Sequence, residues 1–383
     1  MEVLINRKVF LQVIKDIKKI KFRKLGPDIL NYVHFICEKG IVSIYATNLD
    51  VGINKIVNPV FVKSEGEVLL PIKRVYDILK NNVCENVKII QFQSNEVLLV
   101  LDSVSYKMIV PSVHNFPLLP KIDKDSFQTV NSKDIKSFFE SVEYAADKTN
   151  YSIDWKKGVS LYKEDQKLIA LATDSKRLSV NVSSIPLDLP AKRVFIPFDN
   201  MTFLLKFLKK RQHLQVGFSE FNSVFKYHTL TSKDVFSINE TYIFLRVKFD
   251  VDIPSYTFLL HLCYDIEVNL NRNKVKEYLK NILKIIGKKE AILSFIFHEG
   301  VLTLKVKLLK EIDCEIQQTL EIQCPEFQRD FTFALRFNYI ADVINAIDVD
   351  EFTFHKAFDS LSPCMINSCE MPGFSAFIMP FSL

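Results

Sequence analysis

A repeat at a fixed spacing of 126 residues constrains the fold of this chain more than any other feature of its sequence. The segment 46–49 (ATNL) follows the strand-like run IVSIY, and the segment 172–175 (ATDS) follows the strand-like run KLIAL. Pro71 in VLLPIKRVYDILK and Pro197 in VFIPFDNMTFLLK are separated by the same 126 residues. Each proline ends an apolar strand-like run and precedes an amphipathic helical pattern. Two different motifs in one register indicate a duplicated structural unit.

A third, fainter copy follows the first two. The segment 333–347, FALRFNYIADVINAI, repeats the strand-then-helix pattern. Within it, Tyr339 takes the aromatic place held by Val75 or Tyr76 in the first copy and by Phe203 in the second. The chain is therefore predicted to contain three similar units.

The three copies also begin alike, each with an asparagine ahead of a helical pattern. Asn6, Asn131 and Asn271 open NRKVFLQVIKDIKKI, NSKDIKSFFESVEYAA and NRNKVKEYLKNILKII. An asparagine or serine in this place can cap the first helical turn by accepting a backbone N–H bond. Apolar residues then follow at helical spacing: Val9, Val13, Ile17 and Ile20; Ile135, Phe138, Phe139 and Val142; Val275, Leu279, Ile282 and Ile286. Gly287 is the predicted C-terminal cap of the third helix.

Alternating apolar and polar runs lie between the helices, and they predict the fold class. The runs SNEVLLVLDSVSYKMIV and EAILSFIFHEGVLTLKVKLL are typical of antiparallel hairpins with one buried face. Each copy is thus expected to be α+β, with two helices and several strands. Polar stretches near 121–128 and 250–256 place the domains at 1–125, 126–253 and 254–383.

The composition favours an intracellular protein without catalytic or cofactor chemistry. Seven cysteines form no CxxC pair and no zinc-like cluster, so we expect no metal site and a reducing, cytoplasmic location. No apolar run approaches the length of a membrane span, and no signal-like segment opens the chain. Phosphate-loop, nucleophile-elbow and zinc-protease motifs do not occur, and the histidines share no local motif with acidic residues or cysteines. We therefore expect no enzyme and no cofactor, although a site assembled only in space would escape a motif search.

Basic residues recur on the polar faces of the predicted helices. The net charge of +5 is too small to indicate nucleic-acid binding by itself. Their placement is more informative, because equivalent helices of separate copies carry them: Lys8, Lys15, Lys18, Lys19, Lys21, Arg23 and Lys24; Lys206, Lys209, Lys210 and Arg211; Lys276, Lys280 and Lys284. One such face alone would be an ordinary solvated surface, whereas several together could contact phosphates without reading bases.

These segments together resemble the family of bacterial sliding clamps, the beta subunits of DNA polymerase III. The resemblance covers the whole chain. It depends on segments in the order and spacing of the family: ATNLDVGI (46–53), LPIKRVYDIL (70–79), TDSKRL (173–178), IPSY (253–256) and AFIMPFSL (376–383).

The resemblance implies three tandem copies of the DNA clamp fold, with antiparallel sheets outside and helices lining a ring. Two chains would join head to tail, and a heterologous contact whose rotation closes produces such a ring. The ring would encircle double-stranded DNA without sequence specificity. Its expected partners are the replicative DNA polymerase, the clamp loader and other proteins with clamp-binding motifs. The alternative is a divergent interaction scaffold that keeps the clamp fold without closing a ring.

The resemblance also implies a pocket for partner peptides between the second and third copies. Its expected residues are Thr173, Ser175, Lys176, Arg177, Leu178, Pro254, Phe258, Leu259, Tyr339, Ile378, Met379, Pro380, Phe381 and Leu383. Apolar walls would accept the peptide's apolar side chains, and Arg177 and backbone groups would orient it. The family usually has Gly-His where this chain has Ser175-Lys176, and arginine in place of Phe258 and of Ser382. These departures keep the pocket apolar and leave its peptide preference open.

Two further sets of residues follow from the resemblance. At the dimer contact, Arg74, Tyr106 and Met108 of one chain would face Ile285 and Ile286 of the other. At the DNA, loop positions of the family that touch the duplex correspond to Arg23, Lys24, Lys148 and Asn150. An ordinary exposed loop is the alternative for these last four.

Overall fold

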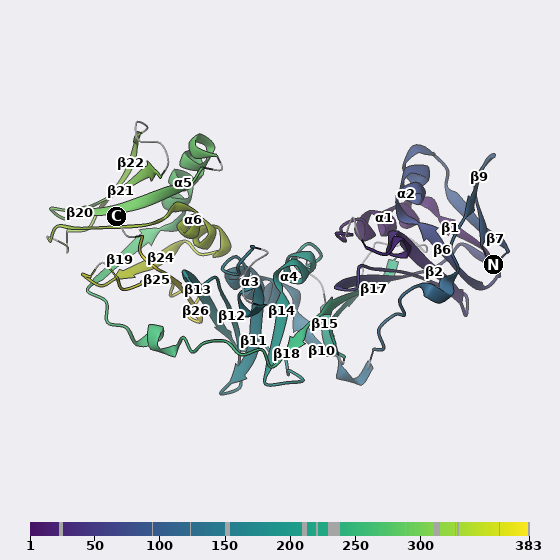
Figure 1. Cartoon of the computed structure of the whole chain (residues 1–383), viewed down its shortest axis with the longest axis horizontal. Coiled ribbons are helices and arrows are strands. Elements are labelled where there is room, and N and C mark those ends of the chain that lie inside the picture. The colour runs from purple at the N-terminus through teal and green to yellow at the C-terminus, as the bar shows by residue number, and fades with distance from the viewer. Residues whose placement is uncertain are drawn as a thin grey trace. The chain divides into compact units, whose positions relative to one another are not determined.

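The computed structural model shows a chain of six α-helices and antiparallel sheets among its described residues (Figure 1). These are residues 1–22, 26–93, 95–122, 124–149, 154–208, 213–219, 221–228, 238–287, 289–309, 315–325, 327, 329–359 and 361–381. They form two compact units. Unit 1 contains residues 1–136, 186–190 and 199–248, and unit 2 contains residues 137–185, 191–198 and 249–383.

Unit 1 contains a five-stranded sheet in the order β5-β1-β7-β8-β9 and an eight-stranded sheet in the order β10-β15-β16-β17-β4-β3-β2-β6. Helices α1 (Arg7–Ile17) and α2 (Ile72–Asn81) pack together in this unit. Its strands are β1 (Glu2–Asn6), β2 (Tyr32–Glu38), β3 (Ile41–Thr47), β4 (Val51–Val57), β5 (Phe61–Ser64), β6 (Gly66–Pro71), β7 (Asn86–Gln93), β8 (Glu96–Leu101), β9 (Val104–Ile109), β10 (Gln128–Asn131), β15 (His213–Phe218), β16 (Asn222–His228) and β17 (Ile238–Arg246).

Unit 2 contains a nine-stranded sheet, β18-β14-β11-β12-β13-β26-β25-β24-β19, and a four-stranded sheet, β22-β21-β20-β23. Helices α5 (Arg272–Ile286) and α6 (Phe337–Ala346) pack together here. Its strands are β11 (Gly158–Glu164), β12 (Lys167–Thr173), β13 (Arg177–Ser183), β14 (Arg193–Pro197), β19 (Ile266–Asn271), β20 (Ala291–His298), β21 (Val301–Leu308), β22 (Glu315–Gln323), β23 (Phe331–Arg336), β24 (Glu351–Lys356), β25 (Cys364–Asn367) and β26 (Phe374–Ile378). Each of three elements has residues in both units: α3 (Ser132–Glu143), α4 (Phe198–Leu205) and β18 (Lys248–Phe249).

The helix starts confirm the predicted asparagine caps. The side chain of Asn6 accepts hydrogen bonds from the N–H groups of Lys8 and Val9. Asn131 accepts from the N–H of Lys133 at 2.8 Å, and Asn271 from the N–H of Lys274 at 3.1 Å. At the other end of α5, Gly287 adopts φ of +60° and donates its N–H to the Leu283 carbonyl, as a C-terminal cap does.

The predicted strand-to-helix passages are also confirmed. Pro71 ends β6 immediately before α2, Pro197 ends β14 before α4, and β23 leads directly into α6. The apolar positions predicted at helical spacing are buried, except for half-buried Val9. The α+β class and the antiparallel sheets are therefore those expected from the alternating and helical patterns.

Both large sheets run across the predicted repeat boundaries. In unit 1, β4 of the first copy pairs with β17 of the second, and we call this pairing seam 1. In unit 2, β13 of the second copy pairs with β26 of the third, and we call this pairing seam 2. The compact units therefore follow the continuous sheets, and each unit takes part of the second copy.

A buried ion pair holds α1 against the large sheet of unit 1. The Lys55 ammonium on β4 lies 2.5 Å from a carboxylate oxygen of Asp16 on α1, and both side chains are buried. Lys19 contacts the other oxygen at 2.7 Å. Burial works against the charged form of Asp16, but the two lysines outweigh it and lower the pKa of this carboxyl.

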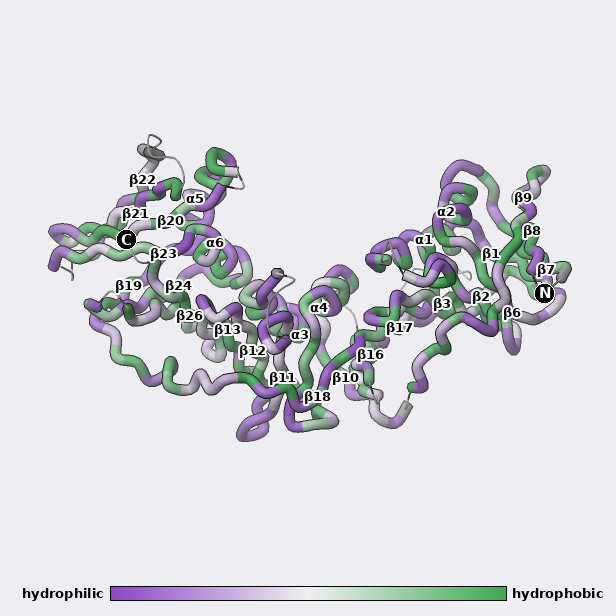
Figure 2. Tube along the Cα trace, viewed as in Figure 1, coloured by the Kyte–Doolittle hydropathy of each residue, from purple (hydrophilic) through white to green (hydrophobic). Residues whose placement is uncertain are grey.

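Hydrophilic and hydrophobic stretches alternate along the chain (Figure 2). Among the described residues, none of the helices combines the length and hydropathy needed to cross a bilayer. The phenylalanines gather in the cores. In unit 2, the rings of Phe295, Phe333 and Phe354 stack on one another with centroids 4.8–5.8 Å apart.

Candidate peptide-binding site

A tight turn between β12 and β13 begins the candidate site at seam 2. The Thr173 hydroxyl donates to the Arg177 carbonyl, and the Asp174 carboxylate accepts the N–H groups of Lys176 and Arg177. Ser175 adopts φ of +75°, a left-handed conformation that non-glycine residues seldom take. The N–H of Met379, just after β26, then donates to the Lys176 carbonyl at 2.9 Å.

The same turn occurs 126 residues earlier, at seam 1. The Thr47 hydroxyl donates to the Val51 carbonyl, and the Asn48 side chain accepts the N–H groups of Asp50 and Val51. Leu49 has φ of +76°, and the N–H of Arg246 donates to the Asp50 carbonyl at 2.8 Å. The two seams therefore match bond for bond, which supports the duplication predicted from sequence.

The connectors that follow each sheet match as well. The connector of seam 1 is the run VPSVHNF (110–116), in which the N–H of Phe116 donates a hydrogen bond to the Val113 carbonyl at 2.9 Å. The connector of seam 2 is the run IPSYTFL (253–259), in which the N–H of Leu259 donates a hydrogen bond to the Tyr256 carbonyl, also at 2.9 Å. Figure 1 shows the second connector, in green, running from β18 toward β19. It contains the 3₁₀ helix Thr257–His261.

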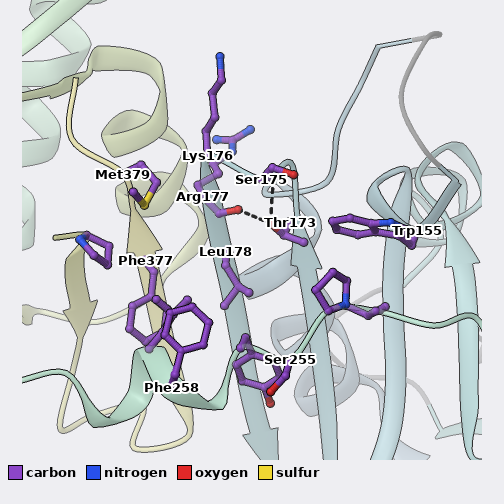
Figure 3. A pocket seen from close by; sticks show the side chains of 15 residues that line it. Trp155, Thr173, Ser175, Lys176, Arg177, Leu178, Ser255, Phe258, Phe377 and Met379 are labelled. Carbon is purple, nitrogen blue, oxygen red and sulfur yellow. Dashed lines mark hydrogen bonds between the residues drawn. The ribbon is translucent and has the colours of Figure 1, made fainter. Parts of the chain in front are cut away.

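An apolar pocket of about 440 Å³ opens at seam 2 between the turn, the connector and the end of β26 (Figure 3). Leu178 stands in the middle of the lining side chains, with Phe258 and Phe377 on one side and Trp155 on the other. The complete lining is Trp155, Thr173, Ser175, Lys176, Arg177, Leu178, Ile253, Pro254, Ser255, Tyr256, Phe258, Leu259, Pro363, Phe377 and Met379. A concave, mostly apolar surface with few polar groups is typical of a site for apolar ligand side chains.

The pocket floor is fixed by buried groups from unit 2. Tyr256 packs with Leu178 and Phe377 in one apolar cluster, and its hydroxyl bonds that of Tyr162 on β11. Burial raises the pKa of both phenols, so both stay protonated at neutral pH. This contact joins the connector to the sheet beneath the pocket.

Arg177 lines the pocket, but its guanidinium is directed into the protein. It donates to Asp174 at 3.1 Å, to Asp342 on α6 at 2.7 Å and to the Tyr144 carbonyl at 2.7 Å. The same group lies 4.5 Å from the centroid of the Tyr339 ring. With its side chain buried and its fork occupied, Arg177 joins α6 to the turn at the pocket wall.

The predicted pocket residues divide into two groups. Nine of them line the cavity: Thr173, Ser175, Lys176, Arg177, Leu178, Pro254, Phe258, Leu259 and Met379. Among the others, Tyr339 stacks on Arg177, Ile378 is fully buried, Phe381 bridges to Ala334 on β23, and Pro380 is half-buried between them. Leu383 lies outside the described residues.

Sequence reasoning missed six lining residues. Ile253, Ser255 and Tyr256 flank the predicted Pro254, and Phe377 pairs with Leu178 across seam 2, so chain adjacency and strand register could have indicated them. Trp155 and Pro363 come from distant loops. No local pattern marks those two residues, because only folding brings their loops to the seam.

At seam 1 a smaller cavity of about 280 Å³ lies over the corresponding turn, and polar side chains form much of its lining, among them Asn31, Asn48, Asp50 and Arg246. Tyr45, Phe116 and Phe244 pack in one buried cluster, and the Tyr45 ring meets those of Phe116 and Phe244 edge-on. Gly52 occupies the place of Leu178, and a Cβ there would lie only 3.2 Å from the Tyr45 ring. At the first seam an aromatic ring therefore lies against a glycine, whereas the second seam has Leu178 at that place in its pocket.

The predicted DNA and dimer residues are dispersed over exposed and buried positions. Lys148 is exposed, with its ammonium 5.4 Å from the Phe198 ring centroid, whereas Arg23, Lys24 and Asn150 lie outside the described residues. In the dimer set, Arg74 is exposed and Tyr106 is half-buried, with its hydroxyl 3.1 Å from the side-chain nitrogen of Asn82. Met108 and Ile286 are buried in their own units, whereas Ile285 is 62% exposed.

Comparison with known proteins confirms the predicted resemblance. Residues 1–120 match the model of the family described as "DNA polymerase III beta subunit, N-terminal domain". The beta sliding clamp of Rickettsia bellii is 20% identical, over 99% of each chain. The DNA polymerase III beta subunit of Thermotoga maritima has a TM-score of 0.79 at 20% identity, over 100% of this chain and 99% of that one. The beta clamp of Helicobacter pylori, solved bound to a DNA ligase peptide, has a TM-score of 0.81 at 16% identity, over 100% of both chains.

Proposed function

We propose that this chain, a full-length relative of the bacterial beta sliding clamps, is itself a DNA sliding clamp. Two copies would close into a ring around double-stranded DNA, hold the replicative polymerase on its template and recruit further partners. The observation that carries the proposal is the apolar pocket at seam 2, built on a chain with the clamp fold over its whole length. Such a role depends on encirclement of the DNA, so we propose that the chain has no catalytic activity and no cofactor. We also propose that it acts in the cytoplasm.

The three domains that we propose, 1–125, 126–253 and 254–383, follow the repeated turns and connectors. Seams 1 and 2 repeat the same hydrogen bonds at the junctions of successive copies. A chain of three similar domains supplies half of a six-domain ring. The head-to-tail contact of two chains would then supply closure.

For the DNA contact, we propose the lysine-bearing helix faces together with Arg23, Lys24, Lys148 and Asn150. Lys8, Lys15 and Lys280 are exposed on their helices and Lys206 is exposed just after α4, as phosphate contacts require. Encirclement prevents lateral escape, so these contacts can stay weak enough to allow sliding. Such contacts would be nonspecific in sequence and would weaken as salt rises.

For the dimer contact, we propose the edge strand β9 with the exposed Arg74 on α2, and the C-terminal turn of α5. β9 is an edge strand of its sheet, and Ile109 on it is 76% exposed. Ile285 at the end of α5 is similarly exposed. An apolar side chain on an open sheet edge favours pairing with another chain.

For partner recruitment, we propose that the seam 2 pocket accepts the apolar side chains of short peptides. The Helicobacter pylori clamp, which carries a DNA ligase peptide in its solved structure, is similar in fold over its whole length. Phe258 and Met379 are 63% and 44% exposed at the pocket, where a peptide could cover them. Burying such apolar side chains would supply most of the affinity.

A topological experiment tests the proposed function. The protein is loaded by a clamp loader onto nicked circular DNA, and the circle is then cut with a restriction enzyme. A closed ring is retained on the circle and is lost from the free ends after cutting, which gel filtration measures. Retention that is the same before and after cutting would contradict encirclement and would favour the scaffold that keeps the fold without a ring.

A further inference from the structure

A second cavity, of about 180 Å³, adjoins the seam 2 pocket, and we call it the β11–β14 cavity. Residues 253–256 of the connector line both cavities. The rest of the lining of the β11–β14 cavity is Tyr162, Glu164, Leu171, Arg193 and Thr257. A molecule in this cavity would therefore touch the connector, but it would meet charged groups that the seam 2 pocket does not have.

Strand register places the charged groups of the β11–β14 cavity on one face of the large sheet of unit 2. Tyr162 on β11 is paired with Arg193 on β14, and Glu164 follows Tyr162 by two residues. Side chains alternate between the two faces of a strand and paired residues share a face, so these three side chains stand together. The backbone of Arg193 is also fixed, because its N–H donates to the Asp250 carboxylate at 3.2 Å and its carbonyl accepts the N–H of Asp250 at 3.0 Å.

Two opposite charges flank the hydroxyl groups of Tyr162 and Tyr256 at this cavity. The Arg193 guanidinium lies 5.6 Å from the centroid of the Tyr162 ring. Burial is the main cause of the raised pKa of both phenols, the Glu164 carboxylate raises it further, and Arg193 lowers it. Both charges therefore lie close enough to act on the hydroxyl pair. Among the residues that the structure describes, Glu164 and Arg193 form no ion pair with each other or with a third side chain.

The hydroxyl pair also has one proton without an acceptor. The hydroxyls of Tyr162 and Tyr256 are hydrogen-bonded to each other, and each has a single O–H. One proton makes that bond, so the other needs a further acceptor, and no described side chain or carbonyl supplies one. A carboxylate between Arg193 and this hydroxyl would accept hydrogen bonds from both groups.

The first copy of the repeat lacks this arrangement. Ile36 and Glu67 stand 126 residues before Tyr162 and Arg193 and are likewise paired across two strands. There an aliphatic side chain replaces the phenol, and the Glu67 carboxylate contacts His34 at 2.7 Å. The unpaired charges around a hydroxyl pair are therefore a feature of the second copy, and the repeated backbone does not require them.

We propose that the β11–β14 cavity binds a free α-amino acid with an apolar side chain, of about the size of valine or leucine. The ligand carboxylate would lie between Arg193 and the free hydroxyl proton, and the ligand ammonium would face Glu164. Leu171, Ile253 and Pro254 supply apolar walls for the side chain. A ligand with only one charge would leave the opposite charge of the site uncompensated and would be repelled by Glu164 or by Arg193.

The size of the cavity agrees with such a ligand. One water molecule occupies about 30 Å³ of liquid, so the cavity of about 180 Å³ has room for roughly six to nine non-hydrogen atoms. The assignment does not depend on the proposed clamp function, so either of the two can fail alone.

Ligand-observed NMR titrations of the full-length protein test the site with three probes of one shape. L-Leucine has both charges, 4-methylpentanoate has only the carboxylate, and 3-methylbutylamine has only the ammonium. The variants are Arg193→Gln and Glu164→Gln. Lys192→Gln is the matched control, because Lys192 is exposed beside Arg193 but does not line the cavity. Thermal unfolding curves check the folding of each variant, and the comparison of probes on the wild type needs no variant.

We expect L-leucine to bind the wild type with a dissociation constant of about 1 mM or below, about tenfold more tightly than either single-charge probe. Arg193→Gln should weaken L-leucine binding about tenfold, Glu164→Gln should abolish the preference for L-leucine over 4-methylpentanoate, and Lys192→Gln should change neither. Equal binding of L-leucine and 4-methylpentanoate to the wild type would overturn the assignment of an amino acid. An unchanged affinity in Arg193→Gln, or no binding of L-leucine up to about 20 mM, would overturn the site itself.

Discussion

At the residue scale, Arg177 shows how one side chain can maintain a binding site that its charge does not enter. It joins the turn, the segment just after α3, and α6 through Asp174, the Tyr144 carbonyl and Asp342. The stacked Tyr339 ring covers the guanidinium face. The functional effect of Arg177 should therefore follow from stability of the pocket wall and not from direct recognition of a peptide.

Replacing Arg177 tests this role. Arg177→Met should lower the free energy of unfolding by about 3 kcal/mol, the low end for a broken buried ion pair, because it leaves the largely buried Asp174 unpaired whereas Asp342 is 37% exposed to water. Arg177→Lys keeps the charge but lacks the planar fork, so it should recover only part of the loss. Urea unfolding measures both variants. A midpoint unchanged in Arg177→Met would show that the three contacts contribute little to stability.

At the element scale, the C-terminal segment after β26 has two roles that can be separated. The N–H of Met379 binds the turn at Lys176, and the N–H of Phe381 binds the Ala334 carbonyl on β23 at 2.7 Å. Met379 also forms part of the pocket wall. The segment therefore completes the site while the proposed dimer contacts lie on other elements.

Deleting residues 379–383 should abolish binding of the polymerase and leave the dimer intact. The deletion removes a pocket wall, whereas β9 and α5 keep their own packing. A pull-down with the polymerase measures the first effect, and sedimentation the second. A Met379→Ala variant serves as the milder control and should weaken binding without abolishing it. Loss of the dimer in the deletion would instead show that the tail is mainly structural.

At the scale of the whole molecule, ring closure requires two chains, and sedimentation equilibrium at micromolar concentration measures it. Ile109→Glu on the edge strand β9 should raise the dimer dissociation constant about tenfold or more, because a buried charge replaces an apolar contact. Phe61→Glu is the matched control, since Phe61 is 61% exposed on β5, at the opposite edge of the same sheet. Equal dissociation constants for the two variants would argue against β9 as the dimer contact.

The sequence by itself determined the local structure and the repeat. Local features depend on residues that are close together in the sequence: the helical spacing, the asparagine caps and the proline that ends a strand. The elements around Asn6, Asn131 and Asn271 could therefore be predicted from short segments. The spacing of 126 residues likewise located the turns at Thr47 and Thr173. Most of the pocket lining came from the resemblance, through segments that adjoin these motifs.

The tertiary structure alone decided how the cavities at the two equivalent seams differ in size and lining. The turns at Thr47 and Thr173 make the same hydrogen bonds, yet the first seam has a cavity of about 280 Å³ lined in part by Asn48, Asp50 and Arg246, whereas a mostly apolar cavity of about 440 Å³ opens at the second. It also decided that the guanidinium of Arg177 is occupied by contacts within the protein, and that Trp155 and Pro363 join the lining. The physical reason is that packing volume and charge pairing depend on side chains from distant segments, whereas turns and caps depend on residues a few positions apart.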